Sequence, residues 1–143
     1  MFLKPKKSLG QNFLIDKNII DKIIYAAKIK SSDIVLEIGP GTGNLTKFII
    51  SKNPKKIYSI EKDENLANSL EKQYLNKISV VKKDILKIPY EFYSGKKFLI
   101  LGNLPYNIST KILSDFCLNK NLFTITNHIS TSITDNLNNT CFF

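Results

Sequence analysis

The chain has 143 residues, of which 43% are hydrophobic, and it carries a formal net charge of +9 at pH 7. This length fits a single domain with a modest core, and because no apolar run approaches the length of a membrane span, we expect no membrane partner. The positive charge favours a polyanionic partner, with nucleic acid the leading candidate, although the lysine bias of an AT-rich genome explains the charge equally well.

Residues 1–16 are basic and loop-like, and Asp16 can cap a helix over residues 17–28. Apolar side chains recur on this helix at helical spacing and are expected to face a sheet: Ile19, Ile20, Ile23, Ile24 and Ala27. Strands are predicted over 33–38, 56–60, 78–81 and 97–101, helices over 42–52, 63–73 and 108–118, and a loop over 85–95. This alternation predicts an α/β fold with a parallel sheet of about four strands and right-handed crossovers.

The end of the chain differs in composition from the rest. Lys120 is the last basic residue, and from Thr124 the sequence is rich in Thr, Ser and Asn. We interpret residues 120–143 as a weakly structured tail after a domain over 17–119, with a polar β-hairpin as the alternative. Cys117 and Cys141 lack metal-like spacing and His128 has no partner motif, so we predict reduced thiols and no metal site.

A glycine-rich turn follows the first predicted strand, where residues 34–43 read I-V-L-E-I-G-P-G-T-G. Gly39, Gly41 and Gly43 let the backbone turn tightly and leave no side chain between it and a ligand, and the next helix presents unpaired N–H groups. This order indicates a site for a nucleotide-like cofactor. With Glu37 at the strand end, the pattern resembles motif I of the class I S-adenosylmethionine (SAM) methyltransferases, and a turn in another α/β protein is the alternative.

Acidic residues end the next two predicted strands. Because ligands bind at the carboxyl ends of parallel strands, Glu61 is placed to accept hydrogen bonds from a ribose diol, with a solvated surface acid as the alternative. Asp84, after the third strand, suits an adenine exocyclic amine, and capping of a short turn is an equally weighted alternative.

The fourth predicted strand runs into Asn103, Leu104, Pro105 and Tyr106. This Asn-Leu-Pro-Tyr segment resembles motif IV of methyltransferases that act on adenine or glutamine nitrogen. The Asn oxygen and a backbone carbonyl can accept both hydrogens of an adenine N6, which aims its lone pair at a methyl donor, and Pro105 stiffens the turn. Tyr106 can stack on a base turned out of its helix. A strand-to-helix turn without a catalytic role is the alternative.

Four segments together resemble the ribosomal RNA adenine dimethyltransferase family of the KsgA/RsmA type. They are K-K-S-L-G-Q-N-F-L (6–14), L-E-I-G-P-G-T-G (36–43), I-E-K-D (60–63) and G-N-L-P-Y-N-I-S-T (102–110). The resemblance implies a Rossmann-like class I SAM-dependent methyltransferase fold with helices on both faces of the sheet. It also implies dimethylation at N6 of two adjacent adenosines near the 3′ end of small-subunit (16S) rRNA.

Residue by residue, the resemblance implies that six positions contact SAM: Asn12, Leu14, Gly39, Glu61, Asp84 and Asn103. Gly41 belongs to the same cofactor loop, and residues 103–106 would hold the target adenine. The basic N-terminal segment would approach RNA phosphates, and no metal is implied. We expect a cytoplasmic location, because the family motif begins almost at Met1 and no secretory segment precedes it. We also expect a monomer that acts on an immature 30S-type particle.

Two rival functions remain. The Erm branch of the same superfamily methylates large-subunit (23S) rRNA, and a non-catalytic RNA-binding remnant would keep only the first half of the fold. Members of the family continue past this point, with a seven-stranded sheet and a helical C-terminal domain, so we expect only the N-terminal part of the fold here. The loss of lysine after Lys120 suggests a frameshift or a gene-model error.

Overall fold

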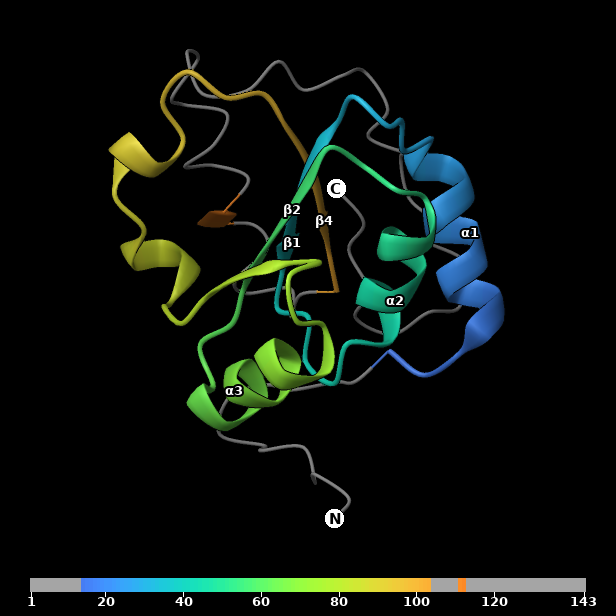
Figure 1. The fold of residues 1–143 in the computed structure, drawn as a ribbon, viewed down its shortest axis with the longest axis horizontal. Coiled ribbons are helices and arrows are strands. Elements are labelled where there is room, and N and C mark those ends of the chain that lie inside the picture. The colour runs from blue at the N-terminus through green and yellow to red at the C-terminus, as the bar shows by residue number, and fades with distance from the viewer. Residues whose placement is uncertain (1–13, 104–110, 113–143) are drawn as a thin grey trace.

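The computed structural model describes residues 14–103 and 111–112. Four parallel strands form one sheet in the order β3-β2-β1-β4, and Figure 1 shows them crossing the centre of the molecule. The strands are β1 (Ile34–Ile38), β2 (Lys56–Ile60), β3 (Ser79–Val81) and β4 (Phe98–Gly102). Ile38 pairs with Ile60 on one side and with Gly102 on the other, so three strands end side by side. The predicted parallel α/β sheet is confirmed.

Side-chain caps fix where two of the α-helices in the described part of the chain begin. The helices are α1 (Lys17–Ala27), α2 (Asn44–Ser51) and α3 (Glu64–Gln73). Asp16 accepts a 2.8 Å hydrogen bond from the Asn18 N–H at the start of α1, as predicted. Asp63 accepts from the first N–H groups of α3 in the same way. Such caps satisfy donors that have no partner within the helix.

Apolar side chains pack on both faces of the sheet. On one face, α1 and α2 cover the strands, and the buried core comprises Ile20, Ile23, Ile24, Val35, Leu45, Ile49, Ile57 and Leu101. The predicted apolar stripe of α1 is therefore confirmed. On the other face, the buried residues are Leu36, Ile38, Ile60, Tyr93, Phe98 and Ile112. Figure 1 shows α1 and α2 on one side of the strands and the segment after β3 on the other.

The structure corrects several predicted boundaries. Helix α2 begins at Asn44, two residues later than predicted, because Gly43 is left-handed (φ 80°) and cannot continue a right-handed helix. The predicted loop over 85–95 contains two short 3-10 turns, η2 (Ile85–Lys87) and η3 (Tyr90–Phe92). Strand β4 begins and ends one residue later than predicted.

Other predictions fall on residues that are not described. Of the predicted helix over 108–118, only 111–112 are described, and both are helical; the tail over 120–143 lies outside the described residues. Among the residues that are described, no helix is both long and apolar enough to cross a membrane.

Candidate functional site

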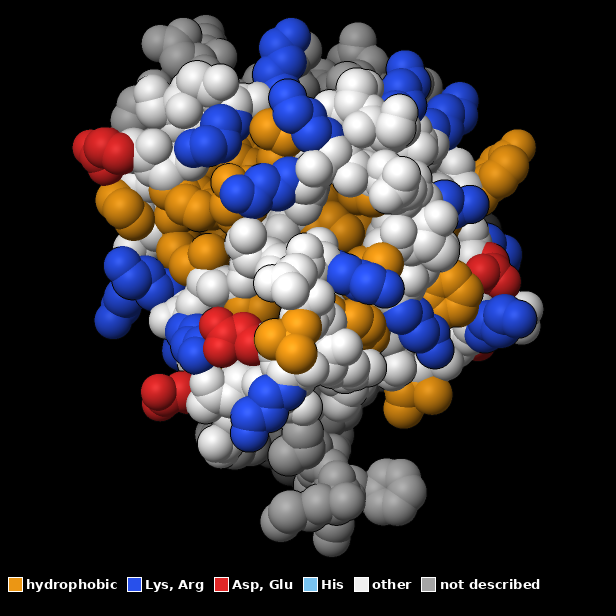
Figure 2. All heavy atoms as spheres, in the orientation of Figure 1, with side chains coloured by type: hydrophobic (Ala, Val, Ile, Leu, Met, Phe, Trp, Pro, Cys, Tyr) orange, Lys and Arg blue, Asp and Glu red, His pale blue; other side chains and the backbone are white. Residues whose placement is uncertain are grey.

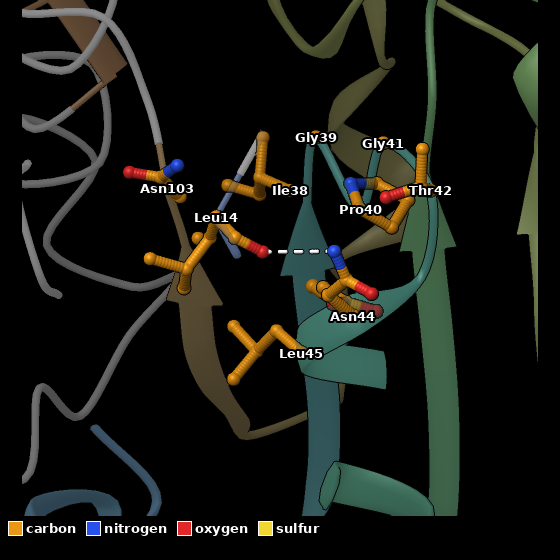
Figure 3. A pocket seen from close by; sticks show the side chains of 11 residues that line it. Leu14, Ile38, Gly39, Pro40, Gly41, Thr42, Asn44, Leu45 and Asn103 are labelled. Atoms are coloured by element: carbon orange, nitrogen blue, oxygen red, sulfur yellow. Dashed lines mark hydrogen bonds between the residues drawn. The ribbon is translucent and has the colours of Figure 1, made fainter. Parts of the chain in front are cut away.

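A pocket lies where β1 and β4 end and α2 begins. Figure 3 shows its lining: Leu14, Glu37, Ile38, Gly39, Pro40, Gly41, Thr42, Asn44, Leu45, Gly102 and Asn103. The pocket has a volume of about 20 Å³, which is room for little more than one water molecule. The described residues therefore enclose too little space for a ligand the size of a nucleoside.

The glycine turn wraps the end of β1 in a conformation that other residues adopt with strain. Gly39, Gly41 and Gly43 have φ angles of 66°, 60° and 80°. The Gly39 N–H donates to the Ile60 carbonyl at 2.9 Å, which continues the β1–β2 pairing into the turn. Gly39 and Gly41 therefore present bare backbone to the pocket, between the side chains of Pro40 and Thr42.

Glu61 is not the solvated surface acid that the sequence left open, because only 6% of it is exposed. Its Oε2 accepts from the Gly41 N–H at 3.1 Å, and its Oε1 accepts from the Asp63 N–H at 2.9 Å. The carboxylate at the end of β2 therefore holds the centre of the glycine turn. Each carboxylate oxygen has a second lone pair, so this contact leaves acceptor capacity for a diol.

Glu37 is a buried acid that the sequence marked only as part of a motif. Its side chain accepts from the Thr46 hydroxyl, at 3.0 Å to Oε1 and 2.8 Å to Oε2, and from the Ser59 hydroxyl at 3.0 Å. Burial raises the pKa of Glu37 to about 7, the two hydroxyls oppose this rise, and the charge of Glu61 adds to it. The network joins β1, α2 and β2 beneath the pocket.

Asp84 has the capping role that the sequence weighed. Its Oδ1 accepts from the Leu86 N–H at 3.0 Å at the start of η2, and its Oδ2 lies 3.0 Å from Lys62 Nζ. Partial burial acts to raise the pKa of Asp84, but the hydrogen bond and charge of Lys62 and the Leu86 N–H outweigh it, so the pKa is lowered. Recognition of an adenine by Asp84 stays a prediction.

A hydrogen bond fixes Leu14, the first described residue, against the pocket. The Asn44 Nδ2 donates to the Leu14 carbonyl at 2.9 Å, shown dashed in Figure 3, although the two residues are far apart in sequence. Asn103, at the end of β4, lines the same pocket. The predicted site residues Leu14, Gly39, Gly41 and Asn103 thus come together, whereas Asn12 and residues 104–106 lie outside the described residues.

The start of α2 suits a cofactor with a negative group. Its N-cap, Gly43, makes no side-chain cap hydrogen bond, and its first turn has no acidic residue. The first N–H groups of the helix therefore have no side-chain acceptor, and the positive end of the helix dipole faces the glycine turn. Glu61 adds carboxylate acceptors beside the same turn. Within the described part of the chain, no cluster of His, Cys, Asp or Glu could hold a metal ion.

Tyr74, at the end of α3, contacts the last glycine of the turn. Its hydroxyl donates to the Gly43 carbonyl at 3.0 Å, and a Cβ at Gly43 would lie 2.9 Å from Tyr74 Cε2 and 2.8 Å from Leu70 Cδ2. Burial raises the pKa of Tyr74, and the charge of Glu37 adds to the rise. Sequence reasoning missed this contact, because nothing local pairs positions 43 and 74.

We expect Tyr74→Phe to weaken SAM binding by about threefold to tenfold, because loss of one neutral hydrogen bond costs about 0.5–1.5 kcal/mol. Titration calorimetry on the variant measures the change. Tyr25→Phe is the control, since Tyr25 is 83% exposed. Equal affinities of Tyr74→Phe and the unmodified chain would show that this hydroxyl does not hold the turn in its binding conformation.

Comparison with known proteins gives consistent matches. The family model for ribosomal RNA adenine dimethylase matches residues 2–135. The chain is 51% identical over 119 residues to ribosomal RNA small subunit methyltransferase A of Pelagibacter ubique (strain HTCC1062). This alignment covers 83% of this chain and 45% of the relative. It thus spans less than half the length of that relative.

Solved structures also resemble this chain, and two of them are more than 30% identical to it over most of its length. A dimethyladenosine transferase from Plasmodium falciparum matches with a TM-score of 0.67 at 38% identity, over 78% of this chain and 40% of that one. The 23S rRNA methyltransferase ErmE matches with a TM-score of 0.67 at 32% identity, over 78% of this chain and 45% of that one.

Proposed function

The chain belongs to the ribosomal RNA adenine dimethylase family, and from this premise we propose that it supplies the SAM-binding part of a small-subunit rRNA adenine N6-dimethyltransferase. Its substrate would be two adjacent adenosines near the 3′ end of 16S rRNA. The bond between Glu61 and the Gly41 N–H is the observation that carries the proposal. It joins the acid at the end of β2 to the glycine turn after β1, which is where a nucleoside cofactor binds in this class of sheet.

We assign the cofactor roles to residues at the strand ends. Glu61 would accept from the ribose hydroxyls, Asp84 from the adenine amine, and Gly39 and Gly41 would let the backbone approach the ligand. Asn12, Leu14 and Asn103 would complete the contacts with the cofactor. For Leu14 and Asn103, the support is their place in the pocket lining.

We assign the target base to residues 103–106. SAM supplies an electrophilic methyl group on a sulfonium, and the chain's part is to orient the adenine amine toward it. The Asn103 side-chain oxygen and the Leu104 carbonyl would accept the two N6 hydrogens, and Tyr106 would stack on the base. In each transfer a nitrogen–carbon bond would form as the carbon–sulfur bond breaks, which would leave the sulfur as a neutral thioether, and the amine would release one proton to solvent. Pro105 would keep the turn rigid.

The finer partner assignments are also proposals. The net charge of +9 supports an rRNA partner, and we propose an immature 30S-type particle as its context, with the chain acting as a cytoplasmic monomer. The fold of ErmE, at 32% identity, favours Erm-type methylation of 23S rRNA as the second candidate. The sequence of the 39–43 turn and Leu104 of the Asn-Leu-Pro-Tyr segment resemble the small-subunit branch more closely.

The test has two steps. SAM binding to the purified 143-residue chain is measured by titration calorimetry, and we expect saturable binding with one site. Transfer of labelled methyl groups is then measured on immature small subunits and, in parallel, on protein-free 23S rRNA. Label in N6,N6-dimethyladenosine of the small subunit supports the proposal. Label in 23S rRNA alone would establish the Erm-type function, and a soluble chain that does not bind SAM would overturn an enzymatic role for this chain.

A further inference from the structure

A second groove lies at the amino ends of β2 and β3, at the opposite end of the strands from the cofactor pocket. Its volume is about 750 Å³, far larger than that of the pocket. Its polar lining comes from the two loops that lead into these strands: Asn53, Lys55, Lys56, Asn76, Lys77 and Ser79. The proposed function uses none of these residues.

All charged side chains that line the groove are lysines. Lys55, Lys56 and Lys77 are exposed, and the lining includes no acidic residue. Neither ion pair found among the described residues involves these three lysines, since the pairs are Lys62–Asp84 and Lys82–Glu71. Figure 2 shows lysine side chains spread over the whole visible face, with only a few acidic side chains, at its margins and in its lower part. The groove therefore has positive charge without a neutralising partner in the described chain.

The loops that carry these lysines have a defined shape. Asn53 and Asn76 both have left-handed backbones, with φ angles of 51° and 62°, and each reverses the chain between a helix and a strand. The Lys56 N–H bonds to the Asp33 carbonyl at 3.4 Å, and the Lys56 ammonium lies 4.7 Å from the ring centroid of Tyr58. The contact with Tyr58 limits the movement of Lys56 and keeps its charge.

Complementing the helix dipoles does not account for these lysines. The dipole acts within the last turn of a helix, where Lys52 caps α2 and Lys72 lies in α3. Lys55 and Lys77 each lie four residues beyond the last residue of the helix before them. A protein partner is also disfavoured, because the centres of protein interfaces are depleted of lysine, whereas phosphate contacts use Lys, Asn and Ser side chains.

We propose that this groove binds the phosphate backbone of the RNA substrate, as a second contact surface away from the methyl-transfer site. This inference rests on the proposed function for its RNA partner. Strand β2 has five residues, so the groove and Glu61 are separated by about 16 Å. The RNA that fills both must extend well beyond the target adenosines, and the groove selects RNA by its backbone, not by its base sequence.

The test compares two triple variants that lower the net charge equally. Lys55→Gln, Lys56→Gln and Lys77→Gln remove the groove charges, and Lys17→Gln, Lys22→Gln and Lys72→Gln remove three exposed charges elsewhere. Binding to a fluorescein-labelled 30-nucleotide hairpin RNA is measured from 50 to 300 mM KCl. Each lost phosphate contact lowers the slope of log K against log salt by about 0.7–0.9. For the groove variant we expect the magnitude of this slope to fall by about 2. We also expect this variant to bind the hairpin at least about tenfold more weakly at the lowest salt.

The outcomes separate this proposal from the proposed function. Calorimetry with SAM is expected to give the same affinity for the groove variant and the unmodified chain, which shows that the fold is intact. If the salt dependence of RNA binding decreases in the groove variant alone, the result supports RNA binding by the groove, even if the chain does not bind SAM. Equal losses in both variants, no loss in either, or an unmodified chain that does not bind the hairpin would each overturn it.

Discussion

Glu61→Ala is expected to lower the affinity for SAM by at least about 100-fold. The Glu61 carboxylate accepts the Gly41 N–H through one oxygen and the Asp63 N–H through the other, in a site where 6% of the residue is exposed. Alanine leaves both donors without this acceptor and removes the proposed acceptors of the ribose diol. Hydrogen bonds to a charged group contribute about 1.5–3 kcal/mol each, so two of them correspond to a factor of about 100 or more.

Calorimetry with SAM measures this loss, and two variants control for it. Glu61→Gln keeps the size of the side chain, but its amide nitrogen must face one of the two N–H donors, so we expect a loss close to that of alanine. Glu91→Ala removes an exposed acid on η3 and is expected to bind SAM normally. If Glu61→Ala binds within threefold of the unmodified chain, Glu61 neither holds the turn nor contacts the cofactor.

The sequence predicted the elements well where local signals bound them. Strand β2 has the predicted limits of 56 and 60, because Asn53 and Pro54 end the preceding helix and an acid follows the apolar run. The cap at Asp16 was predicted correctly for a similar reason, since an N-cap and the helix it starts are neighbours in sequence. Periodicity alone identified the buried face of α1.

Contacts between distant residues could not be read from one sequence. Glu37 meets Ser59 across 22 positions, and Asp84 meets Lys62 across the same number, so neither pairing has a local pattern. The start of α2 was predicted too early because a sequence shows that residue 43 is glycine but not that its φ is 80°. The sequence predicted the site as a set of strand ends, but not its hydrogen bonds, because these join residues that are far apart in the chain.

Glu37→Gln is expected to remove a pH dependence of stability worth about 3 kcal/mol. Burial raises the pKa of Glu37 from 4.5 to about 7. Below pH 4.5 the carboxyl group is protonated in both the folded and the unfolded chain. Between pH 4.5 and 7 the unfolded chain loses this proton while the folded chain keeps it, so the free energy of unfolding falls as pH rises. The loss is complete above pH 7, and about 2.5 pH units correspond to about 3 kcal/mol.

Glutamine cannot ionise, and it retains one carbonyl oxygen for the Thr46 and Ser59 hydroxyls, which can also accept from its amide. Urea unfolding of the variant and the unmodified chain between pH 4 and 8.5 measures the difference. We expect the free energy of unfolding of the variant, relative to that of the unmodified chain, to rise by about 3 kcal/mol from the lowest to the highest pH. Taking the difference cancels the titration of acids that are common to both chains.

The charged and titratable groups around Glu37 determine how this difference is interpreted. The Glu61 charge raises the pKa of Glu37, and the charge of Glu37 in turn raises the pKa of Tyr74. As a control, the same pH series is recorded for Glu91→Gln, which changes an exposed acid alone. Parallel pH profiles for Glu37→Gln and the unmodified chain would mean that Glu37 is ionised in the folded state at neutral pH. The Thr46 and Ser59 hydroxyls would then stabilise a buried carboxylate beneath the cofactor pocket, instead of a neutral carboxyl group.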